Sequence, residues 1–113
     1  MRDIMKIEHL NNCTVVKYER IRLDAASAPD FIKIVCESMN KLPKPTQAIV
    51  LDLKGVEFAD SSGLGAIVLI FQKLQTKLVL CGVGEQVEKL IKATRLDSIF
   101  RLYQNSSLAI NAV

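Results

Sequence analysis

The chain has 113 residues and a mass of 12.6 kDa; half of its residues are hydrophobic and 24% are charged. This composition supplies one hydrophobic core and excludes an intrinsically disordered chain, which would be poor in apolar residues. The formal net charge of +3 is spread along the sequence, so it predicts neither a nucleic-acid partner nor a membrane surface. We therefore expect residues 1–113 to form a single domain.

The cysteines and the apolar runs indicate the compartment. Three cysteines are an odd number for a disulfide framework, and with one histidine, His9, they have no metal-ligand spacing. Cys13, Cys36 and Cys81 lie in apolar-patterned segments and are expected to be small core residues. No apolar run approaches the roughly 18 residues of a membrane-spanning helix, and the first residues show no apolar h-region followed by a cleavage site. We expect a cytoplasmic protein without membrane insertion.

The first half of the chain alternates strand and helix patterns. Ile4–His9 and Cys13–Tyr18 are short β-prone segments, and Asn11–Asn12 between them predicts a hairpin turn because asparagine tolerates positive φ. Apolar residues at helical spacing then predict a helix over Ala25–Lys41. Ala48–Leu53 is a nearly continuous apolar run, typical of a central strand that is buried on both faces.

The second half continues this alternation, which predicts an α/β domain whose mixed sheet begins antiparallel and is parallel where helices cross over. In chain order we expect a loop at Gly55–Ala59, a helix from Asp60 to about Gln75, a buried strand at Leu78–Cys81, an amphipathic helix marked by Val87, Leu90 and Ile91, an edge strand near Leu102–Tyr103 and a closing helix at Ser106–Ala112.

The start of the second long helix has an unusual sequence, Asp-Ser-Ser-Gly-Leu-Gly at residues 60–65. Asp60 is placed to cap the helix, and the two serines follow in the first turn at the positive end of the helix dipole. Each glycine lowers helix propensity by roughly 1 kcal/mol relative to alanine, and a close approach of another backbone or of a docking macromolecule would explain why they are present. The alternative is a capped helix packed tightly on the sheet, with incidental serines.

The same helix is expected to carry apolar residues on two sides. At 100° per residue one set forms a core stripe: Leu64, Ile67, Val68, Phe71 and Leu74. Leu69 falls nearly opposite that stripe, with Ala66 and Ile70 beside it. Apolar residues opposite a core stripe are either incidentally exposed or part of a partner surface.

The segment Val50–Gly65 resembles the signature of STAS domains, the domains of sulfate transporters and anti-sigma factor antagonists. Ile21–Pro29 is similar to the family's entry into its first helix, and Val87–Leu96 to its later helix and turn. The resemblance covers nearly the whole chain and implies one STAS-like α/β domain, with a mixed, mostly parallel sheet and helices packed mainly on one face. The connection Lys73–Lys77 differs from the family because it lacks a glycine-rich turn.

The six-residue string at 60–65 is similar to that of stand-alone bacterial antagonists, in which a partner that is both kinase and anti-sigma factor phosphorylates the serine after the aspartate. The resemblance implies an anti-sigma factor antagonist with Ser61 as phosphoacceptor and no catalysis, cofactor or metal of its own. The implied partners are the kinase, which binds the unphosphorylated form, and a serine phosphatase. The expected partner-binding residues are Asp60, Ser62, Gly63, Gly65, Ala66, Leu69 and Ile70.

Several other functions are alternatives to this one. STAS domains also serve as accessory subunits of lipid-transport ABC complexes and in stress-signalling scaffolds. A response-regulator receiver would use Asp52 as phosphoacceptor, but the first strand ends without an acidic pair for Mg²⁺, and Lys77 precedes its strand. An enzyme is disfavoured because His9 has no paired base or nucleophile motif.

Overall fold

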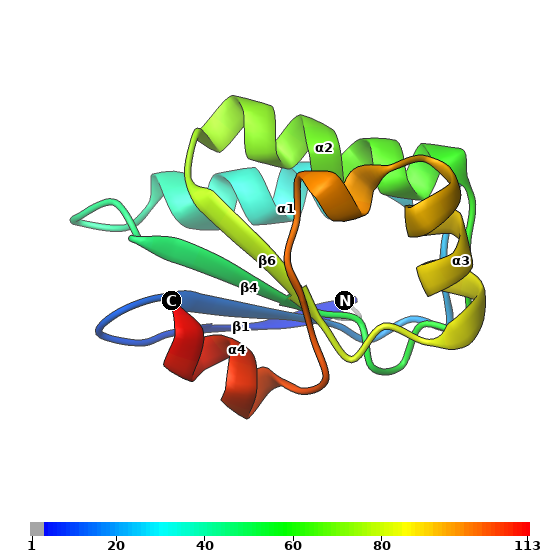
Figure 1. The fold of residues 1–113 in the computed structure, drawn as a ribbon. Helices are drawn as coiled ribbons and strands as arrows, with labels where there is room; N and C mark the ends of the chain where they lie inside the picture. Colours follow the sequence, from blue (N-terminus) through cyan, green and yellow to red (C-terminus); the bar gives the residue numbers. More distant parts are fainter. Residues whose placement is uncertain (1–3) are drawn as a thin grey trace.

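A five-stranded sheet runs through the molecule, and helices lie on both of its faces (Figure 1). The computed structural model describes residues 4–113. β1 pairs antiparallel with β2, whereas the other neighbouring strands are parallel, which confirms the mixed, mostly parallel sheet. In sheet order the strands are β1 (Met5–His9), β2 (Thr14–Tyr18), β4 (Ala48–Asp52), β6 (Lys77–Cys81) and β7 (Leu102–Tyr103).

Most of the helices cover one face of this sheet, as expected. They are α1 (Ala28–Asn40), α2 (Ser61–Leu74), α3 (Glu85–Ala93) and the short 3₁₀ helix η1 (Leu96–Ser98), whereas α4 (Ser106–Ala112) lies on the opposite face (Figure 1). Within residues 4–113 we find no helix with the length and apolar character that a membrane span requires.

Strand β4 is buried along its whole length because both of its faces meet hydrophobic layers. Ile49 and Leu51 belong to the larger core under α1 and α2, and Val50 belongs to the smaller core under α4. This two-sided burial explains the continuous apolar run in the sequence.

Two local expectations about the first half need correction. The hairpin turn lies where it was predicted, and the Leu10 amide donates to the Cys13 carbonyl at 2.8 Å, but neither asparagine of the turn has positive φ. Helix α1 begins at Ala28 instead of Ala25. Asp24 and Ser27 form a separate turn before it, in which each backbone amide donates to the other's side chain, at 2.9 and 3.3 Å. Side-chain bonds of this kind compete with helix formation.

The sequence did not predict a second, two-stranded parallel sheet formed by β3 (Arg22–Leu23) and β5 (Phe58–Ala59). The expected loop at Gly55–Ala59 therefore ends in a strand. Two-residue strands are too short to show an alternating pattern, so sequence periodicity could not have revealed them. This small sheet leads directly into α2 and positions its first turn.

The departure from the STAS pattern at Lys73–Lys77 has a simple structural solution. Gln75 adopts the left-handed conformation with φ 51°, and its amide donates to the Phe71 carbonyl at 2.9 Å. Gln75 thus ends α2 in the conformation that a glycine usually supplies.

Candidate functional site at the start of helix α2

Asp60 links the first turn of α2 to the loop before α1. Its Oδ1 accepts a hydrogen bond from the Gly63 amide at 2.9 Å, and its Oδ2 accepts one from the Ala25 amide at 3.3 Å. The Asp60 amide donates to the Leu23 carbonyl at 3.3 Å. Because both carboxylate oxygens are engaged within the chain, Asp60 acts primarily as a positioning residue.

Strand β5, which directly precedes Asp60, is hydrogen-bonded along both of its edges. On one edge it pairs with β3. On the other, the side-chain amide of Gln86 from α3 accepts from the Ala59 amide and donates to the Ala59 carbonyl, both at 2.9 Å. No sequence pattern indicates this role of Gln86, because Gln86 lies 27 residues away from Ala59 along the chain.

The two glycines of the motif have different structural environments. A Cβ at Gly63 would lie 2.0 Å from the Leu23 carbonyl oxygen, so only glycine allows α2 to approach β3 this closely. A Cβ at Gly65 would meet no heavy atom within 4 Å. Packing within the domain therefore explains why residue 63 is glycine. No contact among the described residues of the domain requires glycine at position 65.

Ser61 and Ser62 are both exposed in the first turn of α2. The first amides of a helix have no intrahelical acceptor, and the aligned peptide dipoles give this end a partial positive charge. No acidic residue occupies the first turn beyond the cap itself. This end of α2 can accommodate an added anion without disturbing the fold.

The face of α2 expected to bind a partner is narrower than the sequence suggested. Leu69 is 38% exposed, but Ala66 and Ile70 are only 3% and 1% exposed, so their placement beside Leu69 on an open face was wrong. Helix α1 packs directly beside α2, while Phe71 contacts Phe100 edge-to-face at 5.3 Å on the ring centroids. Neighbours on two sides bury more of α2 than a single stripe.

Gly63 is also buried and belongs to this internal packing. Leu64 and Ile67 lie in the core as expected, whereas Val68, Phe71 and Leu74 are only partly buried. The exposed residues of α2 are Ser61, Ser62, Gly65, Leu69, Gln72 and Lys73.

The loop beside this face is stiffened by Arg22. Its guanidinium lies 4.4 Å from the centre of the Phe58 ring, and its Nε donates to the Asp24 carboxylate at 3.1 Å. This hydrogen bond from Arg22 lowers the pKa of Asp24. Ala25, which binds Asp60, follows in the same loop and is exposed, so it adjoins the start of α2.

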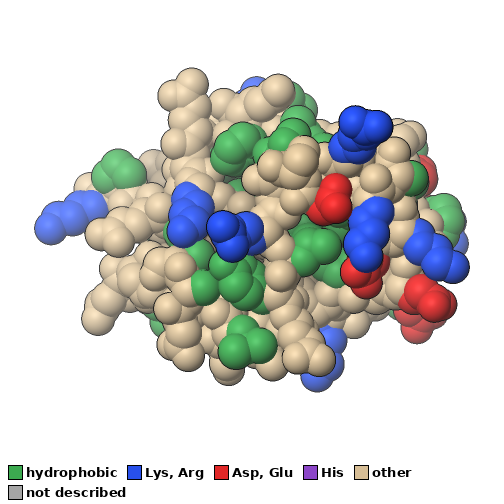
Figure 2. All heavy atoms as spheres, in the orientation of Figure 1, with side chains coloured by type: hydrophobic (Ala, Val, Ile, Leu, Met, Phe, Trp, Pro, Cys, Tyr) green, Lys and Arg blue, Asp and Glu red, His purple; other side chains and the backbone are tan. Residues whose placement is uncertain are grey.

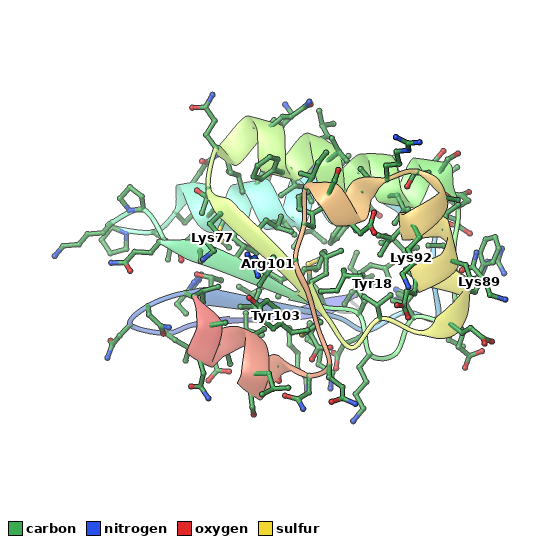
Figure 3. All side chains as sticks on the ribbon, viewed as in Figure 1. Tyr18, Lys77, Lys89, Lys92, Arg101 and Tyr103 are labelled. Atoms are coloured by element: carbon green, nitrogen blue, oxygen red, sulfur yellow. The ribbon has the colours of Figure 1, made fainter. Side chains whose placement is uncertain are left out.

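Charged side chains of both signs surround the same end of the molecule. Figure 2 shows them alternating on the right-hand side, over α3. Lys89 and Lys92 of α3 project outward there (Figure 3), and Lys92 pairs with Glu88 at 3.1 Å. The mixed signs indicate a polar rim without a concentrated positive charge.

The histidine, cysteine and acidic side chains do not form a metal or thiol site in the part of the chain that the structure describes. No group of three histidine, cysteine or acidic side chains gathers within residues 4–113 to hold a metal. Cys13 and Cys81 are buried, as expected, and Cys36 is half-buried. Burial, with a smaller effect of the Asp52 carboxylate, raises the pKa of the Cys81 thiol to about 12, so this thiol stays protonated at neutral pH.

The STAS domain family model matches residues 5–109. The chain belongs to the STAS domain family. An anti-sigma F factor antagonist from Paenibacillus polymyxa is 35% identical over 65 residues, which are 55% of this STAS domain and 56% of that protein, so the match spans about half of each chain.

Solved structures of similar proteins agree with the fold. An anti-sigma factor antagonist from Mycobacterium paratuberculosis has a TM-score of 0.83 and 28% identity, over 96% of this STAS domain and 92% of that chain. The anti-sigma factor antagonist SpoIIAA in its unphosphorylated form has a TM-score of 0.78 over 96% of this chain and 94% of its own. At 16% identity, that likeness concerns the fold alone.

Proposed function

We propose that this STAS domain is an anti-sigma factor antagonist. Its unphosphorylated form binds a cytoplasmic anti-sigma factor that is also a serine kinase, and this binding releases the sigma factor. The observation that carries the proposal is the exposed Ser61 in the first turn of α2, directly after the Asp60 cap, in a family whose similar members are named antagonists. The domain acts by binding, without catalysis or a cofactor of its own.

The exposed face of α2 supports docking of such a partner. Ser61 and Ser62 offer small neutral hydroxyls, Gly65 leaves open space above the helix backbone, and Leu69 adds an apolar contact one turn further on. A kinase must reach the acceptor hydroxyl, and Ser61 is exposed on this face. A glycine that weakens the helix without an internal reason is explained if a partner backbone lies against it.

Phosphorylation of Ser61 is the proposed switch. A phosphoserine carries about −1.5 to −2 charges at pH 7, and the helix N-terminus tolerates them, so the fold persists. The Asp60 carboxylate is fixed beside Ser61 by the Gly63 and Ala25 amides and cannot easily turn away. The added charge therefore faces the partner and opposes binding, until a serine phosphatase restores the hydroxyl.

Phosphosite mapping tests this proposal. We would incubate the purified protein with ATP and an anti-sigma factor kinase of its own organism, and locate the phosphate by mass spectrometry. We expect phosphate on Ser61, none in Ser61→Ala, and phosphate still located on Ser61 in Ser62→Ala. Phosphate on Ser62 alone or on Asp52 would contradict the assignment. Copurification with subunits of an ABC transporter, and no kinase, would favour the transport role.

A further inference from the structure

Strand β1 forms one edge of the five-stranded sheet, and β2 is its only strand partner among the described residues. An edge strand presents backbone N–H and C=O groups that can pair with another strand. The direction of these groups in β1 follows from two hydrogen bonds at the ends of the hairpin. The Ile4 carbonyl accepts from the Glu19 amide, and the Leu10 amide donates to the Cys13 carbonyl, both at 2.8 Å.

These bonds show that the even-numbered residues of this segment point their backbone groups toward β2. Because the direction alternates along an antiparallel strand, Met5, Ile7 and His9 point their N–H and C=O groups away from β2, to the free edge. Ile7 lies at the centre of the strand, with one outward-pointing residue on each side. This spacing suits pairing about a twofold axis through Ile7.

We propose that a second copy of this chain binds along β1, antiparallel and centred on Ile7, so that the two sheets become one. In this register Ile7 bonds to Ile7 of the second copy, and Met5 bonds to its His9. Every outward-pointing group of β1 then has a partner. The proposal concerns a surface separate from Ser61 and does not rest on the proposed function.

The side chains of β1 are complementary to themselves in this register. Lys6 is placed opposite Glu8 of the second copy, and Glu8 opposite its Lys6. Both side chains are exposed. They form non-hydrogen-bonded pairs, in which cross-strand side chains approach most closely, and opposite charges there stabilise the pairing. A register centred on Lys6 would also pair outward-pointing backbone groups, those of Met5 with those of Ile7 of the second copy, but it would place Lys6 directly opposite Lys6. The charges of the side chains therefore select the register centred on Ile7.

Ile7 supplies the apolar contact of the same interface. Its side chain is half-buried, packed against the larger core on the helix-covered face. Pairing would cover the exposed remainder with Ile7 of the second copy. The β1 edge belongs to the sheet layer, whereas Ser61 lies on the helix layer above it (Figure 1), so a dimer would leave both α2 sites open.

Sedimentation velocity over concentrations from about 5 μM to about 1 mM tests the association, because small interfaces are commonly weak and a weak dimer forms only at high protein concentration. Amide hydrogen exchange by NMR identifies the surface. We expect the amides of Met5, Ile7 and His9 to gain protection as concentration rises. The amides of Lys6 and Glu8, already bonded to β2, should be protected throughout.

Charge variants test the register. Lys6→Glu places like charges opposite each other at two points of the dimer and should raise the dissociation constant about tenfold. The double variant Lys6→Glu/Glu8→Lys should restore it to within about twofold. Ile7→Pro removes an outward N–H that β2 does not use, so it should abolish dimerisation while circular dichroism shows the fold retained.

A monomer at every concentration, with freely exchanging amides at Met5, Ile7 and His9, would overturn the proposal. A dimer that is insensitive to both Lys6→Glu and Ile7→Pro would overturn it as well, since association would then use another surface.

Discussion

Replacing each glycine of the α2 motif by alanine separates backbone packing from helix propensity. In Gly63→Ala the new methyl carbon would lie 2.0 Å from the Leu23 carbonyl oxygen and 2.7 Å from its carbonyl carbon, so backbone atoms have to move. In Gly65→Ala the methyl carbon meets nothing within 4 Å. The two substitutions are chemically identical and two residues apart in one helix, so each is the control for the other.

The expected magnitudes have opposite signs. Alanine gains roughly 1 kcal/mol over glycine in a helix, so Gly65→Ala should stabilise the domain by about 1 kcal/mol and raise Tm by about 4 °C. Gly63→Ala gains the same propensity, but overpacking against rigid backbone costs about 3 kcal/mol. The displacement also weakens the 3.3 Å bond from the Asp60 amide to Leu23. We expect a net loss of about 2 kcal/mol and a Tm lower by about 8 °C.

Urea and thermal unfolding of the three proteins, followed by circular dichroism, measure this difference. A Gly63→Ala variant as stable as Gly65→Ala would refute the close approach of α2 to β3. It would also remove the structural reason for the glycine after the serine pair.

Other predictions concern pH, the β5 strand and the docking face. The pKa of Cys81 is raised to about 12 by burial and, less, by Asp52, whereas an unfolded thiol has a value near 9. The folded chain therefore keeps a proton that the unfolded chain loses, so stability should fall as pH rises above about 9. Cys81→Ala should flatten this dependence in urea titrations, and an unchanged slope would contradict it. Gln86→Ala removes both hydrogen bonds to Ala59 and should cost about 2 kcal/mol in urea unfolding, at about 1 kcal/mol per bond; wild-type stability would show that β5 does not need this support. Leu69→Asp should change stability by less than about 0.5 kcal/mol but weaken anti-sigma factor binding about tenfold in calorimetry. Undiminished binding would place the docking surface elsewhere.

The sequence predicted those elements whose burial shows in a regular pattern. Ala48–Leu53 and Leu78–Cys81 were recognised as central strands because both faces are covered, which requires a continuous apolar run. The closing helix at Ser106–Ala112 has the predicted bounds. Strands β3 and β5 could not be predicted, because each has two residues and they pair with each other although they lie far apart in the sequence.

In the candidate site, too, local features could be predicted from the sequence and features that depend on distant neighbours could not. The Asp60 cap was predictable because its bond to the Gly63 amide spans three residues, and capping chemistry is local. The burial of Ala66 and Ile70 was not, because it depends on helix α1 lying beside α2. Periodicity identifies one buried stripe, but it does not show how many neighbours a helix has.

The affinity of the anti-sigma factor kinase for the unphosphorylated protein and for protein phosphorylated on Ser61 tests the central claim most directly. Isothermal titration calorimetry measures both, and circular dichroism shows whether the fold is kept. The phosphate adds its charge beside the fixed Asp60 carboxylate on the docking face, and removing such an unpaired charge from water costs several kcal/mol, so binding should be weaker by about a hundredfold. Equal affinities of the two forms, with both folded, would contradict the switch.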